Sequence, residues 1–320
     1  MKPRLRAAAR IALGAAMLAL LLWWVDPRAL AQVLRGADPA WLALGLASAV
    51  AANVASALRW WALARWLGAG VGAGWALATY FRGVAINALL PGAVVGGDLY
   101  RTHALARTGL PLLEAGVSVL ADRLSGLWLL VVVGAFAAAF GLAAGTAPAV
   151  APAAAMLRGH GPGALAGLAL LMLLLPLAVL LGWQRGVARP QADVATAERP
   201  WHRRLVLLAH RPRALAQYGW QVLGSTAVQV LSIGTLACGG AAVGADLPWW
   251  AWAAAAVPIF LLATLPVSFG GWGTREAAAV VALGAFGVGA PQAVAVSMLY
   301  GLAALAQALG GLVLLLGRRG

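Results

Sequence analysis

Two short motifs in this sequence combine proline, glycine and charges of both signs within otherwise apolar sequence. The first runs from Leu90 to Arg101, and the second runs from Leu265 to Glu276. Proline ends a helix, glycines leave backbone N–H groups free to face a ligand, and a helix that starts beside them presents its positive end to an anion. Such breaks, repeated in the two halves of a membrane protein, indicate a transport site.

The first motif holds the charged pair that is best placed to bind an anion. Arg101 lies one helical turn after Asp98, so its guanidinium can bind that carboxylate or a phosphate oxygen. Asp122 and Arg123 are either a local ion pair or a gating or headgroup site at the mouth of the next span. The substrate-binding residues expected in this half are Arg82, Asn87, Gly92, Gly96, Gly97, Asp98, Arg101, Asp122 and Arg123.

The second motif repeats the same chemistry. The residues expected to bind substrate here are Ser268, Gly270, Gly271, Gly273, Arg275 and Glu276. The alternative is that both motifs are helix breaks whose ion pairs only allow the charges to be buried. Burying charge at membrane depth is expensive, which favours a functional role. For Arg59, at the end of an apolar segment, we expect a snorkelling or cytoplasmic-end role.

The composition is that of a polytopic membrane protein. Hydrophobic residues make up 63% of the 320 residues and charged residues 10%, with a mean hydropathy of +0.88. The net charge of +14 comes from basic residues in short loops and at the termini, which indicates topology signals and lipid contacts rather than nucleic acid binding. Cys238 is the single cysteine, and the four histidines lack metal-ligand spacing, so we expect no disulfide, metal or cofactor.

Several segments are long and apolar enough to cross a bilayer as helices. They are Ile11–Val25, Trp41–Leu58, Leu124–Phe140, Ala164–Gly182, Tyr218–Gly239 and Gln292–Leu316. Two further regions, 75–123 and 249–289, contain apolar stretches that the Pro/Gly motifs interrupt. We therefore predict a single all-α polytopic membrane domain over residues 1–320, with about six full spans and two broken or re-entrant helical hairpins in an inverted-repeat arrangement.

Basic residues predict the orientation of the chain, because they concentrate on the cytoplasmic side of membrane proteins. With the amino terminus inside, most Lys and Arg residues fall in the cytoplasm, including those of the basic loop 184–213, while Arg28, Arg35 and Arg158 fall outside. This predicts a multi-pass protein of the cell inner membrane with both termini cytoplasmic. Hairpins that return to their own side and hairpins that cross and return fit this distribution equally. We expect the first apolar segment to be a retained helix, although the sequence after it resembles a signal-peptidase site.

Taken together, these motifs resemble the membrane domain of lysylphosphatidylglycerol synthases, a flippase-like family. The resemblance rests on Leu58-Arg59-Trp60, on Asn87-x-Leu89-Leu90-Pro91-Gly92-x-x-x-Gly96-Gly97-Asp98-x-x-Arg101, on Ser118-x-x-x-Asp122-Arg123-x-x-Gly126-Leu127, and on Pro266-x-Ser268-x-Gly270-Gly271-x-Gly273-x-Arg275-Glu276. In that family the domain is similar to a lipid translocator, which carries an aminoacylated phospholipid to the outer leaflet. The sequence ends at Gly320 without the family's soluble aminoacyltransferase domain, so synthesis of the lipid is not implied.

The residues and the resemblance lead to one preferred function and two alternatives. We expect a lipid flippase, in which Arg101 and Arg275 meet in one charged midplane cavity and bind the headgroup of an anionic phospholipid or lipid-linked intermediate. Protonation of Asp98 and Glu276 would release their arginines and couple transport to a proton gradient. The first alternative is a membrane scaffold that binds lipid and docks a separate lipid-modifying enzyme or glycosyltransferase through loop 184–213. A membrane enzyme is the third hypothesis, weakened because no nucleophile–base pair is apparent.

Overall fold

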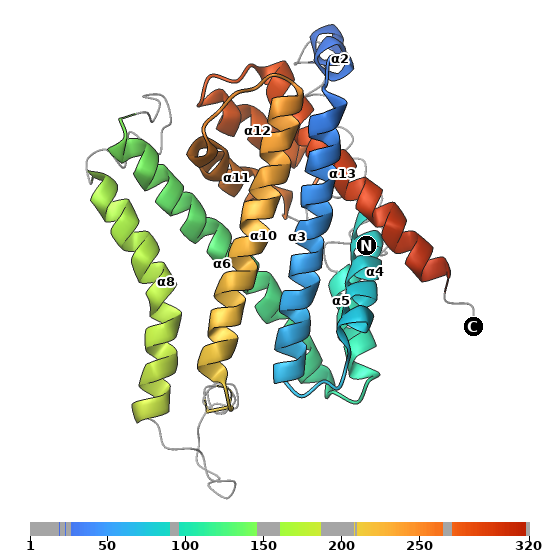
Figure 1. The fold of residues 1–320 in the computed structure, drawn as a ribbon, viewed down its shortest axis with the longest axis vertical. Coiled ribbons are helices and arrows are strands. Elements are labelled where there is room, and N and C mark those ends of the chain that lie inside the picture. The colour runs from blue at the N-terminus through green and yellow to red at the C-terminus, as the bar shows by residue number, and fades with distance from the viewer. Residues whose placement is uncertain are drawn as a thin grey trace, which may run out of the picture.

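The structure, a computed structural model, describes residues 27–89, 96–145, 161–186, 210–264 and 271–317, together with Ala19, Trp23 and Leu208. Regular secondary structure in these ranges is helical, as the sequence predicts (Figure 1). The helices are α2 (Pro27–Arg35), α3 (Pro39–Trp66), α4 (Ala73–Leu89), α5 (Gly96–Ala106), α6 (Leu112–Ala143), α8 (Gly161–Gly186), α10 (Ala214–Ala242), α11 (Trp249–Ala263), α12 (Thr274–Gly284) and α13 (Ala290–Leu316).

Five of the predicted spans are confirmed, because α3, α6, α8, α10 and α13 are each long and apolar enough to cross a membrane. The first predicted span, Ile11–Val25, lies almost entirely outside the described residues, as does most of loop 184–213. Helix α6 begins well before the predicted Leu124, directly after Pro111. The early start places Asp122 and Arg123 within the helix, where contacts with other helices satisfy their charges.

Helices α3 and α10 run antiparallel, and hydrogen bonds at their termini define the two ends of the molecule. At the Pro39 end, the backbone N–H of Asp38 donates to the Ala242 carbonyl at 2.9 Å. At the Trp66 end, the indole N–H of Trp66 donates to the Pro212 carbonyl at 3.0 Å. The Pro39 end is uppermost in Figure 1, and the sequence analysis predicts that the Trp66 end faces the cytoplasm.

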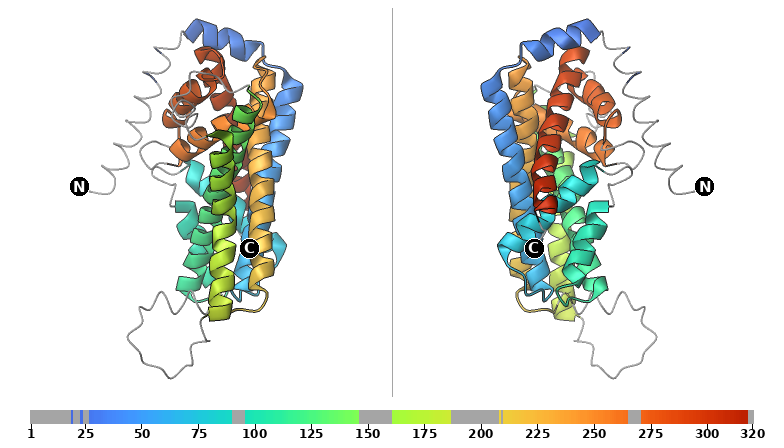
Figure 2. Two further views of the ribbon diagram at one scale, coloured as in Figure 1. Left: turned by 90° about the vertical axis from the view of Figure 1, so that its left-hand side faces the viewer. Right: turned by 90° about the vertical axis from the view of Figure 1, so that its right-hand side faces the viewer.

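Each broken region forms a pair of packed helices that starts and finishes at the same end of the molecule. The start of α4 and the end of α5 share a buried cluster with the end of α3 and the start of α6, represented by Ala76, Leu105, Trp60 and Ala115. Helices α11 and α12 share a second cluster with the end of α10 and the start of α13. Figures 1 and 2 show the α4–α5 pair toward the Trp66 end and the α11–α12 pair toward the Pro39 end.

The longer helix of each pair is too short to cross a bilayer on its own. Helix α4 has 17 residues and α11 has 15, which correspond to about 25 Å and 22 Å at a rise of about 1.5 Å per residue. The hydrocarbon layer is about 30 Å thick. This length, and the opposite ends at which the two pairs begin, support the predicted pair of inverted hairpins.

Candidate functional site

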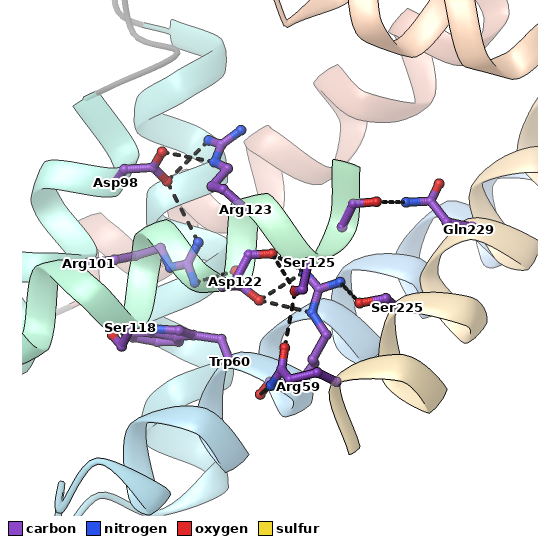
Figure 3. Close-up of polar contacts among 12 residues, drawn as sticks. Arg59, Trp60, Asp98, Arg101, Ser118, Asp122, Arg123, Ser125, Ser225 and Gln229 are labelled. Atoms are coloured by element: carbon purple, nitrogen blue, oxygen red, sulfur yellow. Dashed lines mark hydrogen bonds and ion pairs between the residues drawn. The ribbon is translucent and has the colours of Figure 1, made fainter. Parts of the chain in front are cut away.

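The first group of buried charges is centred on Asp122 of α6. One of its carboxylate oxygens, Oδ1, accepts hydrogen bonds from Nε and Nη2 of Arg59 on α3 at 3.0 Å and 2.9 Å. The other, Oδ2, accepts from Nη2 of Arg101 on α5 at 2.8 Å. All three side chains are at most 5% exposed. With Asp98 and Arg123 added, we call this group the α6 cluster (Figure 3).

Arg59 was missed by the sequence analysis, which placed it at the membrane surface. Its side chain is buried, and it also donates from Nη1 to the Ser225 hydroxyl of α10 at 2.7 Å and from Nη2 to the Asp122 carbonyl at 2.9 Å. The snorkelling prediction is therefore wrong, because acceptors on two other helices stabilise the guanidinium inside the protein. Glycines provide the space: a Cβ at Gly126 or Gly224 would lie 3.4 Å or 3.0 Å from this arginine.

Arg101 lies between two aromatic rings. The carbon at the centre of its guanidinium is 4.3 Å from the ring centroid of Trp60 and 4.5 Å from that of Tyr80. Cation–π attraction of this kind stabilises a desolvated cation without neutralising it. Its Nε is buried and has no hydrogen-bond partner in the part of the chain that the structure describes. Arg101 therefore retains an unused donor.

Asp98 and Arg123 form the more accessible layer of the α6 cluster. Asp98 accepts from Arg123 in a bidentate arrangement, with contacts of 2.8 Å and 3.1 Å, and lies 3.7 Å from Nη1 of Arg101. The side chains of Asp98 and Arg123 are 22% and 36% exposed. The cluster holds three arginines and two aspartates, so these five side chains carry a net charge of one positive unit. The structure brings Asp98, Arg101, Asp122 and Arg123, four of the predicted substrate-binding residues, into one group.

The remaining predicted residues of the first half take no part in the ion pairs of the α6 cluster, and two of them lie where α4 meets α5. Asn87 near the end of α4 accepts from the Gly97 backbone N–H at 2.7 Å, and a Cβ at Gly97 would overlap the Gly83 carbonyl oxygen. Gly96 begins α5 and is half-buried. Arg82 lies apart from the cluster, because its Nε donates to the Leu314 carbonyl of α13 at 3.0 Å. Gly92 lies outside the described residues.

The second group of charges is smaller and closes on itself. Arg275 and Glu276 of α12 form an ion pair at 2.6 Å, and Ser297 of α13 accepts from Arg275 and donates to Glu276, both at 3.0 Å. We call these three residues the α12 cluster. Arg275 is 4% exposed and Glu276 is fully buried. One cation and one anion leave this cluster with no net charge.

The start of α12 differs from the predicted anion site. Gly271 and Gly273 adopt positive φ values of 80° and 87°, a backbone conformation that favours glycine, and they turn the chain into the helix. The Gly273 N–H donates to Oε2 of Glu276 at 2.6 Å. A side chain of the helix itself therefore occupies a donor that the sequence analysis left for a ligand. Ser268 and Gly270 lie outside the described residues.

The two clusters do not meet in one cavity in this conformation. Ser225 of α10 contacts the α6 cluster, whereas a Cβ at Gly239 of α10 would lie 3.5 Å from the carbonyl of Val296, the neighbour of Ser297. The 14 residues between these two positions on α10 correspond to about 21 Å at about 1.5 Å per residue. The expected convergence of Arg101 and Arg275 is thus replaced by two buried sites, one toward each end of the molecule.

These features define a polytopic α-helical membrane protein with two opposed hairpins and buried charge clusters. The sequence profile described as "Lysylphosphatidylglycerol synthase TM region" matches residues 8–311, which is almost the whole chain. The protein therefore belongs to this family, as the sequence motifs indicated. A search of curated proteins gave no match. Membership of the family supports a role that involves membrane lipids.

Proposed function

We propose that this protein moves the headgroup of an anionic phospholipid or lipid-linked intermediate between the two leaflets of the inner membrane. The observation that carries the proposal is the excess positive charge of the α6 cluster, which a phosphate would neutralise. Arginine guanidinium groups bind phosphate oxygens with strong, directional hydrogen bonds. The acyl or prenyl chains of the lipid would remain in the bilayer.

The layered structure of the α6 cluster suggests how a headgroup binds. A phosphate that replaces the carboxylate of Asp98 would gain Arg123 and Arg101, including the unused Nε of Arg101. Asp122 and Arg59 would stay paired beneath it and hold the helices together. Shelter of the phosphate among buried donors lowers the cost of moving it through hydrocarbon.

The second half of the molecule supplies the other side of the proposed path. We infer that the α4–α5 and α11–α12 hairpins are re-entrant and dip into the bilayer from opposite sides. The α6 cluster then lies nearer the cytoplasmic face and the α12 cluster nearer the outer face, about 21 Å apart by the rise of α10. A headgroup would pass from one to the other while the hairpins move in turn.

The test is a translocation assay on the full chain in proteoliposomes that contain phosphatidylglycerol with a fluorescent acyl chain. Arg101→Gln removes the excess charge but leaves the Arg59–Asp122 and Arg123–Asp98 pairs intact, so the protein should still fold. We expect its translocation rate to fall at least about tenfold, the equivalent of about 1.4 kcal/mol. Arg65→Gln is the matched control, because Arg65 is an exposed cation on α3 outside the cluster. Equal rates in folded Arg101→Gln and Arg65→Gln proteins would refute the proposal.

A further inference from the structure

An open groove of about 630 Å³ lies beside α5. Its lining residues come from the start of α4 and from α5 and the turn after it: Trp75, Tyr100, His103, Ala104, Arg107 and Thr108. The volume falls in the range of sites that hold small molecules or their headgroups. None of these residues belongs to the predicted site.

The groove carries donors that have no protein partner. His103 lies on α5, and Arg107 lies four residues later in the turn that follows the helix. Both side chains are exposed, and within the described residues neither forms a hydrogen bond or an ion pair. An arginine and an imidazole that line the same groove are complementary to a phosphate. The charge of the groove thus matches the same chemical class of ligand as the α6 cluster.

The aromatic residues of the groove favour a lipid rather than a soluble ligand. Tryptophan and tyrosine are enriched where the hydrocarbon meets the headgroups, and Trp75 and Tyr100 line this groove close to the Trp66 end. Trp75 contributes an apolar wall along which the glycerol backbone and the first methylenes of a lipid can pack. The predicted cytoplasmic orientation of this end places the groove at the inner leaflet.

A short chain of contacts joins the groove to the α6 cluster. Trp75 stacks on Trp60 with ring centroids 6.1 Å apart, and the guanidinium of Arg101 lies 4.3 Å from the Trp60 ring centroid. Tyr100 is also adjacent to Arg101 in sequence. A ligand in the groove is therefore separated from the buried arginine by the two stacked indoles and by α5 itself.

From this placement we infer that the groove is a separate loading site, in which His103 and Arg107 bind the phosphate of a lipid from the inner leaflet before the headgroup reaches Arg101. The inference rests on the proposed function for its place in transport. The binding step can be measured without transport, so the two can fail separately.

The experiment is photo-crosslinking in nanodiscs of phosphatidylglycerol and phosphatidylcholine, using the full chain with a benzophenone amino acid in place of Ala104. We expect preferential crosslinking of phosphatidylglycerol. His103→Gln combined with Arg107→Gln should reduce that yield at least about fivefold, as expected for the loss of a surface cation near lipid. Arg65→Gln removes an exposed cation from the same end and should leave the yield unchanged.

Three results would overturn the inference: a yield that is unaffected by the double substitution, equal crosslinking of the two lipids, or loss of crosslinking when soluble glycerol 3-phosphate is added. The last would identify a soluble phosphate compound as the ligand. A yield that depends on Arg107 in a protein that moves no lipid would support the groove and refute the proposed transport. Lipid transport by a protein whose crosslinking yield is independent of Arg107 would support the proposed transport and refute the groove as a loading site.

Discussion

The α6 cluster and the α12 cluster use the same types of residue but differ in how they are connected. The α6 cluster joins α3, α5 and α6 and reaches α10 through Ser225, whereas the hydrogen bonds among the three residues of the α12 cluster link α12 to α13. The first carries one net positive charge and an unused donor, and the second is neutral with its acceptors occupied. A buried ion pair alone is therefore insufficient evidence for a binding site; the uncompensated charge distinguishes the two.

The largest effect is expected from Asp122→Ala. Removal of this carboxylate leaves Arg59 and Arg101 buried without their shared partner, and loss of one member of a buried pair costs about 3–5 kcal/mol. We expect the variant to fail to accumulate as a folded, detergent-stable protein, measured by size-exclusion chromatography and thermal unfolding. A melting temperature equal to that of the wild type would show that Asp122 does not hold these helices together.

The second prediction separates the neutral cluster from the charged one. Replacement of a complete buried ion pair by apolar residues often changes the free energy of unfolding little. The single variant Glu276→Leu should therefore be destabilised, and the double variant Arg275→Met, Glu276→Leu should recover most of that loss. In the α6 cluster, Arg101→Met with Asp122→Leu leaves Arg59 unpaired and should remain destabilised by about 3 kcal/mol. Unfolding in denaturant measures both. If both double variants recovered the stability of the wild type equally, the two clusters would not differ in how they join the helices.

A third, smaller effect is expected where the first hairpin closes. Gly97→Ala forces a Cβ against the Gly83 carbonyl and the Asn87 amide, and such overpacking costs about 1–3 kcal/mol. Gly74→Ala on α4 is the control, since a Cβ there meets nothing within 4 Å. In thermal unfolding, the melting temperature of Gly97→Ala should be lower than that of the wild type, and that of Gly74→Ala should be equal or higher. The opposite order would refute the close contact of α4 and α5.

The smallest effect on stability is expected from Arg123→Gln. Its pair with Asp98 is partly exposed, and such pairs contribute about 0–1 kcal/mol. The change should nevertheless weaken binding of phosphatidylglycerol, because Arg123 is a proposed phosphate donor. Lipid binding to the variant in nanodiscs, measured beside its melting temperature, checks the two together. A large loss of stability with unchanged binding would assign Arg123 a purely structural role.

Much of this fold can be predicted from the sequence, because the bilayer requires long apolar helices. The five confirmed spans follow from uninterrupted apolar stretches, and the hairpins follow from proline and glycine at fixed places. The apolar segment Leu124–Phe140 covers only part of α6, because Asp122 and Arg123 precede it within the same helix. A charged residue ends an apolar segment in a hydropathy pattern, but it does not end a helix whose charges are paired within the protein.

The residues of the site could be predicted more reliably than their grouping. Asp98, Arg101, Asp122 and Arg123 were identified from local spacing, but no local pattern reports that Arg59 pairs with Asp122 across 63 positions of sequence. Two glycines that lie against the Arg59 side chain in the structure, Gly126 and Gly224, were the signal in the sequence that a large side chain is buried there. The separation of the two clusters also depends on how α10 packs, which neither motif encodes.

Native mass spectrometry of gently extracted protein tests the central claim most directly, because it detects the lipid that the excess charge of the α6 cluster should hold. Every protein compared also carries His103→Gln and Arg107→Gln, which remove the groove as a second lipid site. On that background we predict that an anionic lipid remains bound to the otherwise unchanged protein and to the Arg275→Met, Glu276→Leu protein, and is lost from Arg101→Gln. An anionic lipid that persists on folded Arg101→Gln, or one that disappears only when the α12 pair is replaced, would contradict the account.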